Sequence, residues 1–213
     1  MKPILFNTEM VRAILDGRKT VTRRLVKPQP GPDAELWYCY AGSHKSDIGK
    51  WDDRNGTVDT KWTPPCHGDD VLYVRETWCE NCTNHFLYRA WPGYGQEPEK
   101  QDEAMKILGL KWRPSIHMPK EAARLFLRVK RVRVERLQDI TADECPMEGV
   151  WPLASCTVGE RDAYYRNKFA ELWDSTIKPA DRDTYGWSAN PWVWVIKFER
   201  ISKEEALKGG DTL

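Results

Sequence analysis

The stretch RLFLRVKRVRVERL, residues 124–137, has the strongest β-strand pattern in the chain. Apolar residues alternate with basic ones, as side chains do on the two faces of a strand. The alternation changes phase in the middle, because the apolar positions are odd-numbered up to Val129 and even-numbered from Val132 onwards. Such a change inside one strand is typical of a bulge or a corner. We therefore predict a bulge or sharp bend near residues 130–131.

Other segments on either side of this stretch indicate further strands and a few short helices. A helix is expected wherever apolar residues recur every three or four positions between a capping residue and a Gly or Pro. These patterns predict strands at 3–6, 19–26, 68–78, 86–90 and 192–198, and helices at 9–16, 141–149 and 165–177. We expect residues 86–90 to pair with the 68–78 strand. The fold class is therefore α+β.

Two segments, about 28–66 and 91–111, interrupt this pattern with many Gly and Pro residues. The first also carries several Trp and Tyr side chains, and its Asn55-Gly56 pair is the preferred sequence of a tight hairpin turn. We predict two irregular insertions, of which the first contains one hairpin at that turn.

Composition narrows the classes of protein to which the chain can belong. Its 213 residues carry 33 basic and 32 acidic side chains, and 40% of the residues are hydrophobic. No run approaches the roughly 20 apolar residues of a membrane-spanning helix, and we expect no membrane partner. The N-terminus shows no signal-peptide pattern, so we expect a cytoplasmic protein. A net charge of +1 argues against non-specific coating of nucleic acid but leaves room for a local basic cleft.

Six cysteines in a cytoplasmic protein are expected to be free thiols or metal ligands. One set has spacing that a structural zinc ion could use, although it lacks a second close pair of ligands. The set is Cys66, Cys79, Cys82 and His85. Free thiols are the favoured interpretation, and we expect no cofactor.

Residues 17–24, GRKTVTRR, place a lysine, threonines and arginines where a helix passes into a strand. They are either a solvated strand surface or one edge of a functional site. The chain has no phosphate-binding loop, dinucleotide fingerprint or nucleophile elbow, which argues against nucleotide, redox and esterase chemistry of those kinds.

The spacing Gly17-x-Lys19-x-x-Thr22-x-Arg24, followed by GDDVLYV at 68–74, resembles the ASCH domain family of the PUA-like superfamily. Four further pieces resemble the enlarged ASCH proteins of bacteriophages and prophages: 74–78, 112–119, 131–138 and 190–194. The resemblance implies a small β-barrel flanked by short helices. It also implies one domain over residues 1–201, with a polar tail at 202–213.

The same resemblance implies a cleft for RNA or a modified nucleoside. One bacterial branch of the family removes the acetyl group from N4-acetylcytidine with a Lys, a Thr and a Glu, which correspond to Lys19, Thr22 and Glu148 here. We expect this chemistry to need no metal ion. The side chains expected to bind substrate beside them are Arg24, Arg75, Glu76, Ser115 and His117.

Three interpretations remain open at this point: an amidohydrolase, a non-catalytic RNA-binding module, and an interaction protein of phage origin with a vestigial cleft. The Lys, Thr and Glu favour the first. Two groups of basic residues, at 18–27 and 124–136, favour the second, because they could form one positive surface for phosphates.

Overall fold

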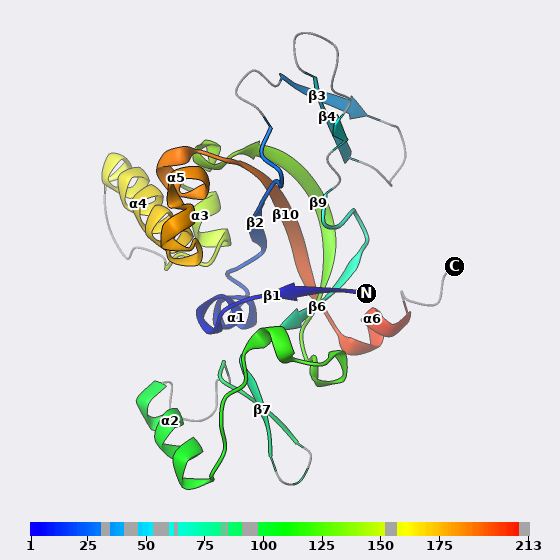
Figure 1. The fold of residues 1–213 in the computed structure, drawn as a ribbon, viewed down its shortest axis with the longest axis vertical. Coiled ribbons are helices and arrows are strands. Elements are labelled where there is room, and N and C mark those ends of the chain that lie inside the picture. Colours follow the sequence, from blue (N-terminus) through cyan, green and yellow to red (C-terminus); the bar gives the residue numbers. More distant parts are fainter. Residues whose placement is uncertain are drawn as a thin grey trace. The chain divides into compact units, whose positions relative to one another are not determined.

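The computed structural model of the chain describes residues 1–30, 35–40, 47–52, 60–61, 64–81, 83, 85–90, 98–151 and 157–208. These residues form a mixed α+β fold, as predicted (Figure 1). None of the described helices is both long and apolar enough to cross a membrane.

The largest sheet has five strands in the order β1-β6-β9-β10-β2. Strands β1 and β6 are parallel, whereas β6–β9 and β10–β2 are antiparallel pairs. The strands are β1 (Lys2–Leu5), β2 (Val21–Leu25), β6 (Val71–Arg75), β9 (Phe126–Arg136) and β10 (Trp192–Ile201). Within the described part of the chain, no pairing between β1 and β2 closes this sheet into a barrel.

The chain divides into two compact units, each built from segments distant in sequence. The first comprises residues 1–18, 70–128 and 199–213, and the second comprises 19–69 and 129–198. The core of the first includes Tyr73, Trp78, Met118 and Phe126. The core of the second includes Val21, Leu137, Phe169, Trp173 and Val195.

Three helices belong to the second unit and lie together beside β2 in Figure 1. They are α3 (Glu144–Met147), α4 (Val158–Thr176) and α5 (Arg182–Tyr185). Helix α4 begins earlier than the apolar periodicity predicts, because the Thr157 and Glu160 side chains form a capping box at its N-terminus. The first unit contains α1 (Thr8–Leu15), α2 (Pro98–Ile107) and α6 (Lys203–Lys208). Helix α6 lies in the segment expected to be a tail, and its Ala206 is buried.

In strand β9 the burial of the side chains changes phase where the sequence does, while the bulge or sharp bend stays a prediction. Lys130 and Arg131 are consecutive and both exposed, while Val129 and Val132 on either side of them are buried. The strand is continuous over residues 126–136 and is curved in Figure 1. Steady alternation is therefore absent at the predicted place.

The insertions are more regular than predicted. The first contains an antiparallel sheet of β3 (Glu35–Tyr40), β4 (Asp47–Asp52) and β5 (Thr60–Lys61). Strands β4 and β5 pair on either side of residues 53–59, so the predicted Asn55-Gly56 turn itself lies outside the described residues.

The second insertion contains α2, although its Gly and Pro residues predicted an irregular segment. Pro98 stands at the first position of this helix, where its missing N–H costs nothing, and good helix formers follow it. The expected pairing of residues 86–90 with the 68–78 segment is present only at the end of that segment, where Trp78 pairs with Tyr88, and β6 has no part in it. Strand β8 (Phe86–Tyr88) pairs with β7 (Trp78–Glu80), whereas β6 lies between β1 and β9.

Candidate active site

A sharp turn after α1 places the Lys19 side chain in the interior of the second unit. Asn7 caps the start of α1, with its side chain accepting a hydrogen bond from the Met10 N–H at 2.8 Å. Gly17 follows α1 with a φ of 76°, a left-handed conformation that glycine adopts without strain. Thr20 is then held on both sides, because its N–H donates to Met147 O and its carbonyl accepts from the Phe198 N–H.

Lys19 forms a buried ion pair with Glu148, 129 residues later in the chain. Its Nζ lies 2.8 Å from Glu148 Oε2, 2.7 Å from the Glu148 carbonyl oxygen and 2.9 Å from the Val21 carbonyl oxygen. The exposed fractions of the two side chains are 0% and 4%. The three protons of the Lys19 ammonium group therefore have three acceptors within the protein.

Glu148 is placed by the end of α3. It is the C-terminal capping residue of that helix, and the chain turns away at Gly149 with a φ of 101°. One carboxylate oxygen accepts from Lys19, and the other accepts from Arg23 Nη1 at 3.0 Å. Two cations from different positions of the chain therefore share this one buried carboxylate.

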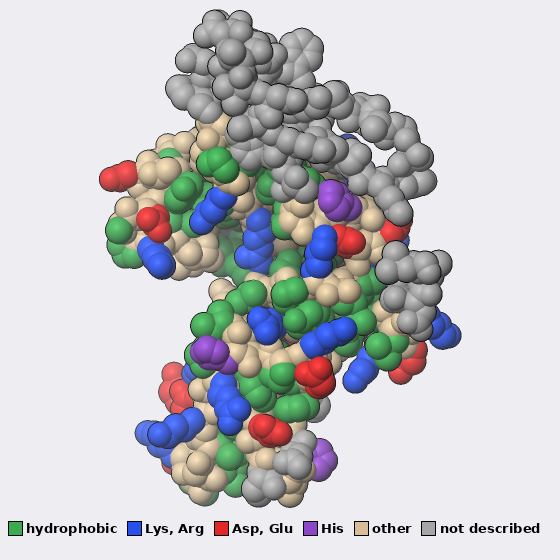
Figure 2. Space-filling view, turned by 45° about the vertical axis from the view of Figure 1, so that its right-hand side comes forward, with side chains coloured by type: hydrophobic (Ala, Val, Ile, Leu, Met, Phe, Trp, Pro, Cys, Tyr) green, Lys and Arg blue, Asp and Glu red, His purple; other side chains and the backbone are tan. Residues whose placement is uncertain are grey.

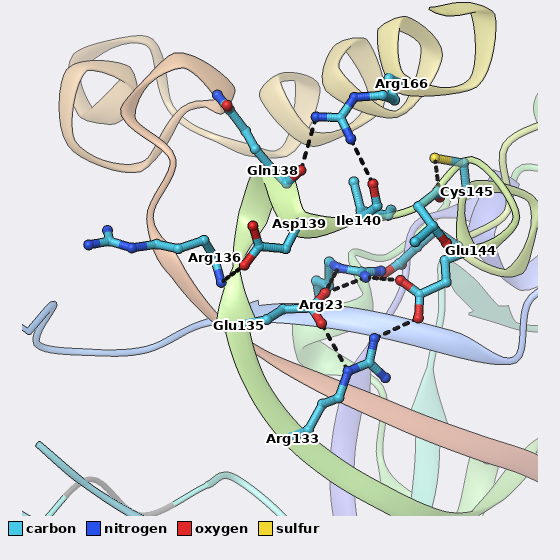
Figure 3. Close-up of polar contacts among 12 residues, drawn as sticks. Arg23, Arg133, Glu135, Arg136, Gln138, Asp139, Ile140, Glu144, Cys145 and Arg166 are labelled. Atoms are coloured by element: carbon cyan, nitrogen blue, oxygen red, sulfur yellow. Dashed lines mark hydrogen bonds and ion pairs between the residues drawn. The ribbon is translucent and has the colours of Figure 1, made fainter. Parts of the chain in front are cut away.

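Arg23, on β2, is the centre of a larger network of charges. Its Nη2 lies 2.6 Å from Glu144 Oε2 on α3, and its Nε lies 3.1 Å from Glu135 Oε1 on β9. Arg133 joins the same two glutamates, with Nε 2.9 Å from Glu135 Oε2 and Nη2 2.6 Å from Glu144 Oε1 (Figure 3). With Lys19 and Glu148, the network contains three cations and three carboxylates.

Burial and the neighbouring charges change the pKa values of this network in different directions. Desolvation lowers the pKa of Lys19 below 10.5, in spite of the attraction of Glu148, and Arg24 and Arg23 lower it further. Desolvation opposes the charge of Arg23 too, but its three glutamate partners outweigh that effect and raise its pKa. Arg23 therefore stays charged, whereas Lys19 is the cation of this group that gives up a proton more readily.

Thr22 and Arg24 lie next to this network on β2. They share one face of the strand by alternation, and their partners in the register with β10 are Ile196 and Trp194. Thr22 is buried and Arg24 is half-buried. Desolvation lowers the pKa of Arg24, against the attraction of Glu148. The described hydrogen bonds do not join the Thr22 hydroxyl to Lys19 or Glu148.

The other predicted binding residues belong to the first unit. Arg75 Nε donates to the Met118 carbonyl at 2.8 Å, and Ser115 and His117 form one short helical turn in which His117 is exposed. Glu76 is buried. The expectation that these residues line one cleft with Lys19 stays a prediction.

Glu76 forms a second buried ion pair. Arg124 Nε and Nη2 donate to its two carboxylate oxygens, both at 2.9 Å. The Arg124 guanidinium also lies 4.2 Å from the centre of the Tyr88 ring. Desolvation raises the pKa of Glu76 in spite of Arg124. Its contacts tie β6 to the segment before β9.

The structure describes three of the four candidate zinc ligands. Cys66 and Cys79 are buried, whereas Cys82 lies outside the described residues. His85 Nδ1 lies 2.9 Å from the Thr83 hydroxyl, and the Asn81 side chain accepts the backbone N–H groups of both residues. Among residues with a described placement, no three His, Cys, Asp or Glu side chains gather closely enough to hold a metal ion.

The sequence-based prediction overlooked four members of the network: Arg23, Arg133, Glu135 and Glu144. Arg23 and Arg133 had been counted only among the basic groups. A signal was available for Arg23, because it shares a strand face with Val21, which the apolar pattern predicts to be buried. The face shown in Figure 2 carries Lys and Arg side chains mixed with acidic and hydrophobic ones rather than a continuous basic surface.

Comparison of the chain with protein-family models, with curated proteins and with solved structures gives no match.

Proposed function

We propose that this protein hydrolyses the acetyl amide of N4-acetylcytidine-like nucleosides, with Lys19, Thr22 and Glu148 as its reacting groups and without a metal ion. The observation that carries the proposal is the buried Lys19–Glu148 pair. Its members are 129 residues apart, and their Nζ and Oε2 atoms lie 2.8 Å apart beside the strand that holds Thr22. The proposal includes an ASCH-type, PUA-like core, of which the five-stranded sheet would be the described part.

An acetyl amide reacts slowly at neutral pH, so its hydrolysis needs a nucleophile, a base and a group that stabilises the oxyanion. Thr22 would be the nucleophile. Lys19 Nζ lies 2.9 Å from the carbonyl oxygen of Val21, the residue before Thr22. The lowered pKa of Lys19 increases the fraction of neutral amine that can act as the base.

The proposed reaction consists of two acyl transfers, the first to Thr22 and the second to water. Thr22 Oγ1 attacks the acetyl carbon as Lys19 takes the hydroxyl proton. The C–N bond then breaks as Lys19 returns that proton to the exocyclic nitrogen, which releases cytidine and leaves an acetyl ester on Thr22. Water, deprotonated by Lys19, cleaves the ester to acetate and restores the Thr22 hydroxyl. Glu148 would stabilise the protonated Lys19, and Arg24 would face the oxyanion from the Thr22 side of β2.

A non-catalytic RNA-binding module is the second candidate, and two observations favour it. Every Lys19 proton and both Glu148 carboxylate oxygens already have partners within the protein, as in a purely structural ion pair. The second unit also pairs cations with aromatic rings, with Arg136 4.4 Å from the Trp192 ring centre and Lys27 5.2 Å from that of Tyr185. Such pairs can bind phosphates and stack on bases.

The test is incubation of the purified protein with N4-acetylcytidine and chromatographic detection of cytidine and acetate. We expect turnover by the wild-type protein after dialysis against a chelator, and none by Thr22→Ala. Lys168→Met is the matched control, because Lys168 forms an exposed pair with Glu171 on α4, and it should keep full turnover.

Absence of cytidine, combined with tight binding of a single-stranded RNA that weakens as salt rises, would replace the hydrolase with the second candidate.

A further inference from the structure

We infer that Arg23 is a positioning residue for the Lys19–Glu148 pair: it fixes the Glu148 carboxylate and supplies the positive charge that lets Lys19 lose its proton. The inference rests on the proposed function, but the contacts that support it do not depend on turnover.

The first step concerns how Glu148 is shared. Its Oε2 accepts from Lys19 and its Oε1 accepts from Arg23, at 2.8 and 3.0 Å. A base must lose its proton during the reaction. If Lys19 were the only cation beside Glu148, its deprotonation would leave a buried carboxylate without a charged partner, which is costly. Arg23 removes this obstacle because it keeps a cation on Glu148 in both protonation states of Lys19.

The second step concerns what holds Arg23. Its guanidinium is fully buried, with a side-chain exposed fraction of 0%. It reaches Glu148 with Nη1, Glu144 with Nη2 and Glu135 with Nε, so each of its three nitrogens has a carboxylate partner. These carboxylates come from β9 and α3, and a planar guanidinium fixes their relative positions in a way that a single ammonium cannot.

The third step is a count of the charges around Lys19. Glu148 faces it from the end of α3, and Arg23 and Arg24 face it from β2. Around Arg23 stand Glu144 and Cys145 of α3 and Glu135 of β9. Arg133 on β9 offsets one of the two negative charges of Glu135 and Glu144, and Arg23 directs its Nη1 to Glu148. Opposite effects therefore act on Lys19: Glu148 favours its protonated form, whereas desolvation, Arg24 and Arg23 disfavour that form.

The test is the titration of Lys19 in the wild-type protein and in Arg23→Gln. The 13Cε signal of Lys19, in protein made with labelled lysine and assigned by its loss in Lys19→Arg, reports the protonation of the amine without any substrate. Arg23→Gln removes one of the two nearby cations and leaves Lys19 as the cation bound to Glu148, so we expect the pKa of Lys19 to rise by about one unit or more. The acidic limb of the pH profile of kcat/KM should move to higher pH by the same amount.

Arg161→Gln is the matched control. Arg161 forms an exposed pair with Asp143, 2.6 Å apart and outside the network, and its loss should leave both the Lys19 titration and the pH profile unchanged. Arg23→Lys is the conservative variant. Because it keeps the charge but not the planar fork, we expect the Lys19 titration within about half a unit of wild type, with a lower kcat and an unchanged KM.

An Arg23→Gln protein that folds with an unchanged Lys19 titration would overturn the inference. If Arg23→Gln does not fold, Arg23→Lys decides: a Lys19 titration moved by more than about one unit would overturn it. If the wild-type protein does not release cytidine, the proposed function fails, and the Lys19 titration still decides whether Arg23 controls its protonation.

Discussion

Removing the charge of Glu148 should destabilise the protein more than removing Lys19, although the two form one ion pair. In Glu148→Gln, Lys19 loses its carboxylate partner and keeps its hydrogen bonds to the backbone carbonyls of Val21 and residue 148, at a site where its side chain is 0% exposed. In Lys19→Met, Glu148 keeps the hydrogen bond from Arg23. The first variant therefore takes the carboxylate away from a buried cation, whereas the second leaves the buried carboxylate with a cation.

The magnitudes follow from this difference. Breaking a buried ion pair by removal of one partner costs about 3–5 kcal/mol, and we expect Glu148→Gln to fall in that range at pH 7. Lys19→Met loses charged hydrogen bonds but leaves no unpaired charge, so we expect about 1–3 kcal/mol. The double variant should lose less than the sum of the two, with a coupling free energy of about 1–3 kcal/mol.

The assay is urea unfolding of the wild type, both single variants and the double variant, followed by tryptophan fluorescence at pH 7. The matched control is the same cycle on Lys168 and Glu171, whose side chains are 46% and 65% exposed, and its coupling should be below about 1 kcal/mol. Equal losses in the two single variants, or a Lys19–Glu148 coupling as small as that of the control pair, would refute the reasoning.

The pH dependence of stability should carry the signature of Lys19. The pKa of Lys19 in the folded protein lies below 10.5, its ordinary value, so at a pH between those two pKa values the unfolded chain binds more protons than the folded protein. The stability of the wild type relative to Lys19→Met should therefore rise with pH over that range, and a difference in urea unfolding that does not change with pH would contradict this. Arg124→Met should cost about 3–5 kcal/mol at pH 7, because it leaves the buried Glu76 carboxylate without this cation. The cost should be smaller in acid, where Glu76, whose pKa burial raises, can take up a proton; equal unfolding midpoints would count against it. Thr22→Ala should abolish turnover while changing the free energy of unfolding by about 1 kcal/mol or less, and full turnover would eliminate Thr22 as the nucleophile. Burial raises the pKa of the Cys145 thiol to about 11, so iodoacetamide at pH 8 should modify it only after unfolding, as peptide mass mapping would show.

The elements that the sequence predicts well are those with local signals. The predicted helix at 9–16 is present as α1, with Asn7 as its cap and a left-handed Gly17 after it. The change of phase in residues 124–137 appears as two consecutive exposed residues in β9. Each of these features depends on a few neighbouring side chains, so the chain's local chemistry is sufficient to predict it.

The elements that the sequence predicts poorly depend on contacts between distant segments. A three-residue strand such as β7 has no periodicity to detect, and its pairing with β8 rather than β6 depends on the whole sheet. The role of Arg23 depends on glutamates 112, 121 and 125 residues away. In sequence it is one of two adjacent arginines in a basic stretch, and only the tertiary structure separates the buried Arg23 from the half-buried Arg24.

The energetics of the network bear on which candidate function is right. A buried ion pair is weak evidence for stability, because well-packed apolar residues of the same size often stabilise a core at least as well. Here, moreover, the side chains of Phe169, Trp173 and Val195 already provide the second unit with an apolar core. A purely structural connection between β2 and α3 could therefore be made with apolar side chains. What apolar side chains cannot supply is an amine whose pKa is lowered by burial while a second cation, Arg23, stays bound to its carboxylate partner. The arrangement of Lys19, Glu148 and Arg23 has that property, and this is the physical reason to test proton transfer before RNA binding alone.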